Sequence, residues 1–201
     1  RDVGEKATKL LDGEIHESTQ IKQLNNPDAR IIHGIVKLDK SLADIAYSFH
    51  GLTCGDMPRM KLAFWEGTKS NIWIPYQGTV KETIAFGGNE YYLRWEQGQG
   101  SINEIIGARK DGTGAWGKKG VLVSQMRLLQ VTLYNEYSFD NNTAALVCKN
   151  PDHLPAVWCF CSSPEYNKEV RKIDQKLNVT NATLVKVPFD LEHWQRVAAE
   201  K

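Results

Sequence analysis

The chain has 201 residues, 41% of them hydrophobic and 24% charged, with a formal net charge of +1 at pH 7. This composition is typical of a globular protein that buries a core, in one large domain or two small ones. The near-neutral charge excludes a global excess of positive charge, so any basic surface that binds nucleic acid has to be local.

The first 58 residues mix helix-like and irregular stretches. They contain seven basic and nine acidic residues, a net charge of −2, which is not the pattern of an obvious DNA-binding surface. Residues 25–28 (NNPD) predict a turn. The chain begins with Arg1 rather than Met and ends at Lys201 within a helical pattern, so we expect it to be a segment of a longer protein.

Short strands are predicted for most of residues 59–150, because β-branched and aromatic residues gather there in short runs divided by glycine clusters. The expected strands are 60–66, 71–76, 91–95, 120–124, 128–134 and 143–148. Turns are expected at 87–89 (GGN) and 98–100 (GQG). Residues 106–120 hold five glycines and few apolar residues, which predicts a long exposed loop.

Residues 151–201 change to helical signals. Residues 162–165 (SSPE) match a capping box with proline in the first turn. The apolar residues that follow fall on one face at helical spacing: Tyr166, Val170, Ile173 and Leu177. We expect these helices, with Trp158 and Ile173 in the core, to form a rigid scaffold.

The last 20 residues predict a strand at 182–187 and then a final helix. Asp190 is expected to cap that helix, with Phe189 and Trp194 placed as a hydrophobic staple. The sheet-rich middle and the helical tail together predict an α+β fold, with a mixed, mainly antiparallel sheet, long loops and a helical C-terminal part.

The four cysteines, Cys54, Cys148, Cys159 and Cys161, lie in apolar stretches without the spacing of a disulfide scaffold. We expect free thiols in a reducing cytoplasm. With His153 some of them could be assembled into a zinc site, but the spacing fits no usual ligand pair, so no metal site is predicted. No apolar run is long enough to span a membrane and no signal peptide opens the chain, so we expect a cytoplasmic protein without membrane partners.

Residues 112–117 (GTGAWG) match the G-x-G-x-x-G pattern of dinucleotide-binding loops. That site needs a strand before the glycines and a helix after them. Here a charged stretch, 109–111 (RKD), precedes them and strand-like residues follow, which favours a flexible loop. The five histidines are scattered and lie in no known catalytic motif, so no catalytic residue is predicted.

Residues 108–127 carry five basic residues and one acidic residue, a local charge of +4. Glycines let such a loop approach a DNA backbone, and an indole can wedge or stack between bases. Glutamine and arginine are the residue types that read adenine and guanine edges, and Gln125 and Arg127 would share one side of a strand. The predicted DNA-contacting residues are Arg59, Arg109, Lys110, Trp116, Lys118, Lys119, Gln125 and Arg127. A solvated loop without a function stays open as the alternative.

Several blocks of sequence resemble one protein family. Residues 51–59 (GLTCGDMPR) and 64–66 (FWE) resemble the GL-x-T/C-GD-x-x-R…WE signature of the C-terminal region of large single-chain DNA methyltransferases. These enzymes belong to bacterial restriction-modification and phage-exclusion systems, and the group is the type II restriction enzyme methylase family. Further agreeing blocks are 86–91 (FGGNEY), 95–96 (WE), 115–118 (AWGK), 139–143 (FDNNT), 154–163 (LPAVWCFCSS), 176–180 (KLNVT) and 186–190 (KVPFD).

The resemblance implies a target-recognition region downstream of a Rossmann-like catalytic domain. That domain carries an Asn-Pro-Pro-Tyr box and methylates the exocyclic amine of adenine, with S-adenosylmethionine as donor. This chain has neither the box nor a glycine loop for the donor. This chain is therefore expected to be non-catalytic and to bind no cofactor of its own. The resemblance implies that the longer parent protein is S-adenosylmethionine-dependent and binds S-adenosylmethionine in its catalytic domain.

In this interpretation, residues 1–50 connect to the catalytic domain and residues 51–201 form the target-recognition domain. The expected partners are double-stranded DNA and the parent methyltransferase domain in cis. A protein-interaction module, which docks the methyltransferase to partner subunits of a defence system, is the alternative. The near-neutral charge and the acidic first 58 residues favour that alternative slightly.

Overall fold

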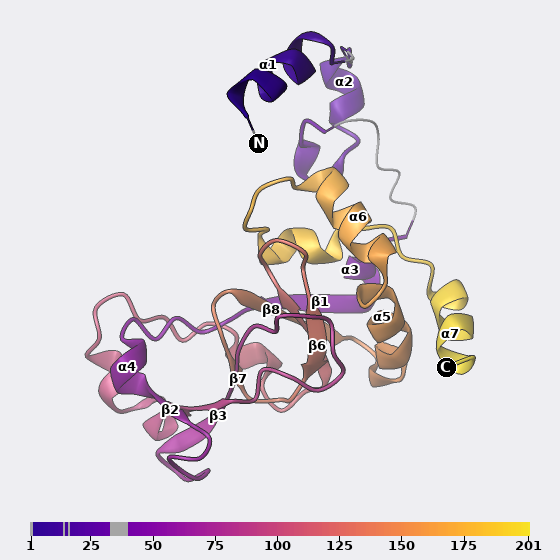
Figure 1. The fold of residues 1–201 in the computed structure, drawn as a ribbon. Helices are drawn as coiled ribbons and strands as arrows, with labels where there is room; N and C mark the ends of the chain where they lie inside the picture. Colours follow the sequence, from indigo (N-terminus) through magenta and orange to yellow (C-terminus); the bar gives the residue numbers. More distant parts are fainter. Residues whose placement is uncertain (1, 14, 16, 33–39) are drawn as a thin grey trace. The chain divides into compact units, whose positions relative to one another are not determined.

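The computed structural model describes residues 2–13, 15, 17–32 and 40–201 (Figure 1). The chain divides into two compact units, Arg1–Lys37 and Leu38–Lys201. The described residues form seven α-helices and two four-stranded sheets, in which all but one of the strand pairings are antiparallel. The α+β class predicted from the sequence is therefore confirmed.

Buried amide side chains link α2 to the turn that follows it in the first unit. It contains α1 (Val3–Leu11), α2 (Gln20–Gln23) and a 3₁₀ turn at Pro27–Ala29. The carboxamide oxygen of Gln23 accepts hydrogen bonds from Asn26 Nδ2 at 2.7 Å and from the Ile32 amide at 3.0 Å. The turn predicted at 25–28 thus exists and is tied to α2 by side-chain hydrogen bonds.

The first sheet has the order β1-β8-β5-β6 and is antiparallel throughout. Its strands are β1 (Ala46–His50), β8 (Thr143–Cys148), β5 (Gly120–Ser124) and β6 (Val131–Tyr134). All residues of β5 and β8 are buried, which fits their continuous apolar sequences. The predicted strands 120–124 and 143–148 are confirmed to the residue.

The second sheet has the order β2-β4-β3-β7. Its strands are β2 (Lys61–Ala63), β4 (Tyr91–Arg94), β3 (Trp73–Gln77) and β7 (Ser138–Phe139), and β7 runs parallel to β3. The strands expected at 60–66, 71–76, 91–95 and 128–134 are all present across the two sheets, but each covers a narrower or shifted range.

Two short helices flank these sheets, α3 (Leu42–Ile45) before β1 and α4 (Met57–Met60) before β2. Ser41 and Asp44 form a capping box around α3, and the backbone hydrogen bond from Ser41 lowers the pKa of the Asp44 carboxyl. Asp56 caps α4 by accepting from the Arg59 amide at 3.3 Å. Side-chain caps thus begin both helices.

An aromatic cluster joins the three C-terminal helices, α5 (Leu154–Cys161), α6 (Pro164–Ile173) and α7 (Leu191–Ala199). Phe160 is fully buried at its centre. Its ring centroid lies 5.3 Å from that of Tyr166 and 5.2 Å from those of Phe189 and Trp194. These are favourable aromatic separations, so Phe160 is the residue that packs the helical part together.

The start of α6 differs from the predicted capping box. Ser163 is the N-cap residue, but its hydroxyl donates to the Phe160 carbonyl at 2.7 Å and makes no cap bond. The three residues expected on the buried face of the helix, Tyr166, Val170 and Ile173, are buried. Leu177 is 63% exposed and lies beyond the end of the helix at Ile173, so its predicted place on the same helix face is wrong.

Two further expectations for the tail need correction. Trp158 is only partly buried, whereas we predicted it in the core. The strand expected at 182–187 is wrong, because Asn181–Val185 form a 3₁₀ helix. Its Leu184 carbonyl accepts from the buried Tyr166 hydroxyl at 3.0 Å.

The Asp190 cap predicted for the last helix is confirmed, with Oδ1 accepting from the His193 amide at 3.1 Å.

β1 also lies outside the predicted organisation. We placed residues 1–50 in a connecting segment, but Ala46–His50 pair along their whole length with β8. The compact unit that contains β1 is Leu38–Lys201. The sheet that carries most of the buried strands thus begins before the predicted boundary.

All four cysteines are buried and unpaired, as the sequence predicted. Burial raises the pKa of the Cys148 thiol to about 11, so this group is a neutral, unreactive thiol. No group of three or more metal-ligating side chains occurs among the residues that the structure describes. Within the same residues, no helix is both long and apolar enough to cross a bilayer.

Candidate nucleic-acid interface

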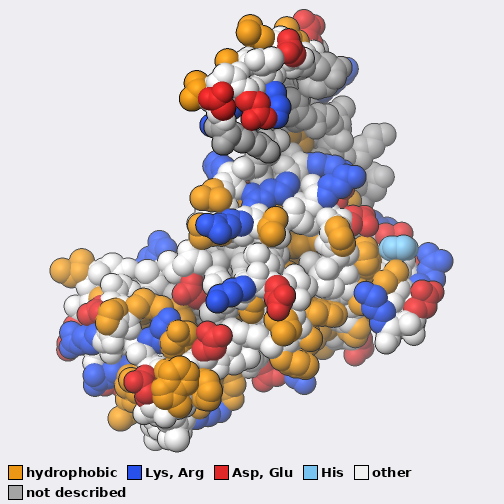
Figure 2. Space-filling view, viewed as in Figure 1, with side chains coloured by type: hydrophobic (Ala, Val, Ile, Leu, Met, Phe, Trp, Pro, Cys, Tyr) orange, Lys and Arg blue, Asp and Glu red, His pale blue; other side chains and the backbone are white. Residues whose placement is uncertain are grey.

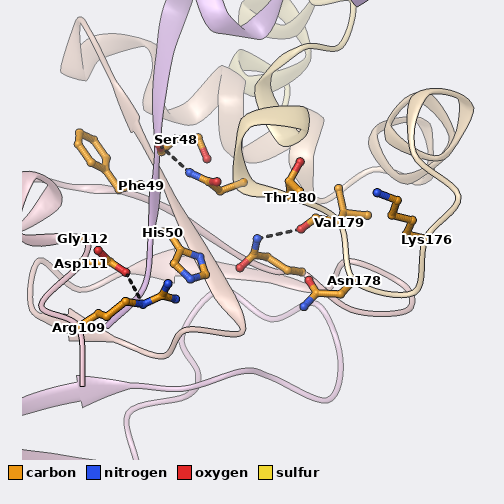
Figure 3. A pocket seen from close by; sticks show the side chains of 12 residues that line it. Ser48, Phe49, His50, Arg109, Asp111, Gly112, Lys176, Asn178, Val179 and Thr180 are labelled. Carbon is orange, nitrogen blue, oxygen red and sulfur yellow. Dashed lines mark hydrogen bonds and ion pairs between the residues drawn. The ribbon is translucent and has the colours of Figure 1, made fainter. Parts of the chain in front are cut away.

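A polar hollow of about 650 Å³ opens on the surface of the Leu38–Lys201 unit (Figure 3). Four segments far apart in the sequence line it: the end of β1, residues 109, 111 and 112, Gln125, and residues 176 and 178–181. We call this space the 48–181 hollow. Its polar lining includes His50, Arg109 and Asn178.

Backbone pairing brings these segments together. Thr53 and Arg109 form an antiparallel bridge, with N–H···O distances of 3.0 and 2.7 Å. Met126 and Asn178 form a second antiparallel bridge. These bridges anchor the loop before β5 and the segment after α6 beside the first sheet, so the walls of the hollow are built by the fold.

Positive side chains stand on opposite sides of the 48–181 hollow. Figure 3 shows Arg109 and Lys176 on its two sides, with the His50 ring between them. Arg109 Nε lies 3.4 Å from Asp111 Oδ2, and the two side chains are 62% and 42% exposed. An ion pair this exposed is weak, so the guanidinium stays accessible to a phosphate.

Gln125 forms part of the wall. It is 3% exposed, and its Nε2 donates to the Val179 carbonyl at 2.8 Å. Its backbone holds the same segment, because Val179 N donates to the Gln125 carbonyl at 2.8 Å. Gln125 therefore positions residues 176–181, and it is not an exposed side chain that reads base edges.

Two buried oxygen atoms belong to residues that line the hollow. They are Gln125 Oε1 and Ser48 Oγ, which have no hydrogen-bond partner among the described residues. A buried acceptor without a partner costs about 1–3 kcal/mol. Such groups call for an explanation in a native protein, and a functional site is one common explanation.

Arg127 lies outside the hollow but next to its wall. β5 ends at Ser124, and Arg127 has a positive φ of 54° in the turn that follows. The predicted shared face is wrong, because Gln125 is buried and Arg127 is exposed. The Arg127 amide donates to the Leu177 carbonyl at 3.2 Å, so this turn packs against the segment after α6.

Trp116 is fixed at the edge of the core. Its ring centroid lies 4.8 Å from that of Trp95, and the ring packs against buried residues of both sheets. Its Nε1 is buried without a hydrogen-bond partner among the described residues. This packing means that Trp116 is not free to wedge between bases in the way that the sequence suggested.

The loop expected at 106–120 is real, but it is only partly exposed. Residues 112–117 form a loop with a 3₁₀ turn at Thr113–Ala115, in which Ala115 is buried. The strand β5 follows this loop, in agreement with the strand-like residues of the sequence. Gly112 has a φ of 80°, and a Cβ there would come within 2.6 Å of the His50 carbonyl oxygen, so only glycine fits this wall of the hollow.

The other predicted contacts are dispersed over the surface and do not line the 48–181 hollow. Lys110 Nζ donates to Asn103 Oδ1 at 2.7 Å, and Lys118 Nζ donates to the Gly114 carbonyl at 2.8 Å. Lys119 is exposed at the start of β5, and Arg59 is exposed on α4. The structure thus brings together only Arg109 and Gln125, with Arg127 close by.

Neither protein-family models nor curated proteins match this chain. A functional assignment therefore depends on the site and on the short sequence motifs.

Residues that the sequence did not single out complete the hollow. They are Ser48, His50, Lys176, Asn178, Thr180 and Asn181. Asn181 Nδ2 donates to the Ser48 carbonyl at 3.4 Å, which ties the two walls together. One signal was available, since residues 176–180 (KLNVT) are among the blocks that resemble the methyltransferase family.

A basic surface adjoins the hollow along α6. Its basic members are Arg127, Lys168, Arg171, Lys172 and Lys176. Lys172 is in an ion pair with Glu169 of the same helix. The Arg171 guanidinium links α6 to the two neighbouring segments by donating to the carbonyls of Arg127 and Lys176. Figure 2 shows Lys and Arg side chains gathered over the region of α6. We call this the α6 basic surface.

Proposed function

We propose that this chain is the DNA-reading region of an adenine-specific DNA methyltransferase, in a bacterial restriction-modification or phage-defence system. The observation that carries the proposal is the 48–181 hollow with Arg109 and Lys176 on its two sides, next to the α6 basic surface. Arginine and lysine hold phosphates in register, whereas asparagine side chains such as that of Asn178 read adenine edges.

Methylation of a base and recognition of the surrounding DNA require separate surfaces. An enzyme that methylates a base takes that base out of the duplex. A separate surface then has to grip the phosphates and read the neighbouring base pairs. We propose that the parent's catalytic domain binds S-adenosylmethionine in cis, and that this chain supplies the grip on double-stranded DNA.

The salt dependence of DNA binding tests this proposal. We expect the 201-residue chain to bind a fluorescent duplex, with an affinity that falls linearly with salt on a log–log plot between about 50 and 200 mM. Replacing Arg109 or Lys176 with alanine removes one phosphate contact, so each variant is expected to lower the slope by about one unit. Fluorescence anisotropy measures both the affinity and the slope.

Two comparison variants sharpen this test. Lys9→Ala removes an exposed lysine of the first unit that is ion-paired with Glu5 at 2.8 Å, and it is expected to leave the slope unchanged. The Lys118→Ala, Lys119→Ala pair examines the loop that the sequence favoured. A smaller slope for this pair alone would move the DNA surface to that loop. No binding by the wild-type chain would contradict the proposal and favour a role in docking partner proteins.

A further inference from the structure

Two neighbouring aromatic side chains are exposed in the turn that follows β2. The exposed fraction is 54% for Phe64 and 72% for Trp65. Their ring centroids lie 5.1 Å apart in an edge-to-face arrangement. Single exposed hydrophobic residues are ordinary, but a paired aromatic surface indicates a place where a partner binds. We call residues 63–66 the aromatic turn.

Hydrogen bonds hold the aromatic turn in place. Phe64 N donates to the Glu90 carbonyl at 2.9 Å, and Glu66 N donates to the Ala63 carbonyl at 2.9 Å. The Glu66 carboxylate accepts from the Ala63 amide at 2.9 Å. The two rings are therefore presented by a fixed backbone, which reduces the ordering entropy that binding would cost.

Positive charges outnumber negative ones in the sequence around the aromatic turn, since residues 59–69 carry three basic side chains and one acidic side chain, that of Glu66. The positive charges are in no ion pair within the described part of the chain. They belong to Arg59, Lys61 and Lys69. Lys61 Nζ lies 3.8 Å from the centroid of the Tyr91 ring, and Lys69 Nζ donates to the Tyr137 hydroxyl at 2.6 Å. Aromatic side chains thus contact both lysines.

Figure 2 shows which kinds of side chain lie on the surface in this region. Hydrophobic side chains gather over the region that carries β2 and β3, with Lys and Arg and also Asp and Glu side chains among them. Exposed aromatic rings among cations are the elements of a platform on which nucleobases stack while the cations attract the backbone. An apolar protein partner would not require the cations, so the charge favours nucleic acid as the occupant.

We propose that Phe64 and Trp65 stack on unstacked nucleobases of bound DNA, as a second contact distinct from the 48–181 hollow. This inference rests on the proposed function, because it assumes that the chain binds DNA. A base that leaves the duplex for methylation leaves neighbouring bases without a stacking partner, and an aromatic ring can take that place.

Binding to a duplex with one unpaired, bulged nucleotide tests this inference. Trp65→Ala is expected to weaken binding of the 201-residue chain to the bulged duplex by about tenfold, the effect of losing one base–aromatic stack. Because stacking releases no counterions, the salt slope is expected to stay the same. Trp65→Tyr keeps a ring and is expected to restore most of the affinity.

Phe86→Ala is the matched control, because Phe86 is an aromatic residue with 78% exposure that lies outside the aromatic turn. It is expected to bind as the wild type does. Wild-type affinity for Trp65→Ala would overturn the inference and leave the proposed function intact. Self-association of the wild type that Trp65→Ala abolishes, with DNA binding unchanged, would also overturn it. If the wild type bound neither duplex, both proposals would fall.

Discussion

Replacing Phe160 with alanine is expected to lower the free energy of unfolding of the Leu38–Lys201 unit by about 3–5 kcal/mol. Phe160 is fully buried, and its ring contacts the rings of Tyr166, Phe189 and Trp194. Truncation leaves a cavity between α5, α6 and α7 that rigid helices fill only in part. Urea unfolding followed by far-ultraviolet circular dichroism measures the change.

Leu177→Ala is the control for this experiment. Leu177 also belongs to the C-terminal part, but it is 63% exposed, so its truncation is expected to change stability by less than about 0.5 kcal/mol. Equal unfolding midpoints for Phe160→Ala and the wild type would contradict the aromatic cluster as the scaffold. The scaffold matters for function because α6 leads directly into residues 176–181, which form one wall of the hollow.

The second large effect is expected at Gly51, directly after β1. A Cβ there would lie 1.9 Å from the Asp140 carbonyl oxygen. That oxygen also accepts from the Thr143 amide at 2.9 Å and from the Thr143 hydroxyl at 2.6 Å, so it cannot move freely. Gly51→Ala is therefore expected to cost about 3 kcal/mol, at the upper end for overpacking.

Gly78→Ala provides the comparison, since the nearest atom to its added Cβ is 3.9 Å away and the contact is ordinary. We expect its unfolding midpoint to stay close to that of the wild type. A midpoint for Gly51→Ala that equals that of Gly78→Ala would show that β1 and the segment after β7 are less closely packed than described. Because Gly51 follows His50, the same substitution is expected to shift one wall of the hollow.

The elements that the sequence predicted best are those whose pattern is local. β5 and β8 are continuous apolar runs, and such runs are recognisable as buried strands without knowledge of their neighbours. The buried face of α6 follows from the helical spacing of Tyr166, Val170 and Ile173. Hydrophobic periodicity along the chain is sufficient for these elements.

The elements that were missed depend on tertiary contacts. β1 is only five residues long and has no continuous apolar run, and its strand structure depends on pairing with β8. Asn181–Val185 have β-branched residues, which favoured a strand. A 3₁₀ helix forms there instead, and the Tyr166 hydroxyl binds the Leu184 carbonyl. Local propensity is overridden where a buried side chain supplies such a contact.

The candidate site was only partly predictable for the same reason. Arg109 and Gln125 drew attention by residue type, but nothing in the sequence brings His50 or Lys176 near them. The bridges between Thr53 and Arg109 and between Met126 and Asn178 bring those segments together, and both are long-range pairings. Trp116, in contrast, was predicted as a contact residue but is not available for one. Its place in a glycine-rich loop suggested an exposed indole, whereas the ring packs against Trp95.

Selection from a library of random duplexes tests sequence-specific DNA recognition, the central claim, most directly. We expect the 201-residue chain to enrich one short sequence. Changing a single base pair of that sequence is expected to cost about 1–3 kcal/mol of binding free energy at fixed salt. Enrichment of no sequence, or equal affinity for the selected duplex and for random duplexes of the same length, would contradict the proposal that this chain reads DNA.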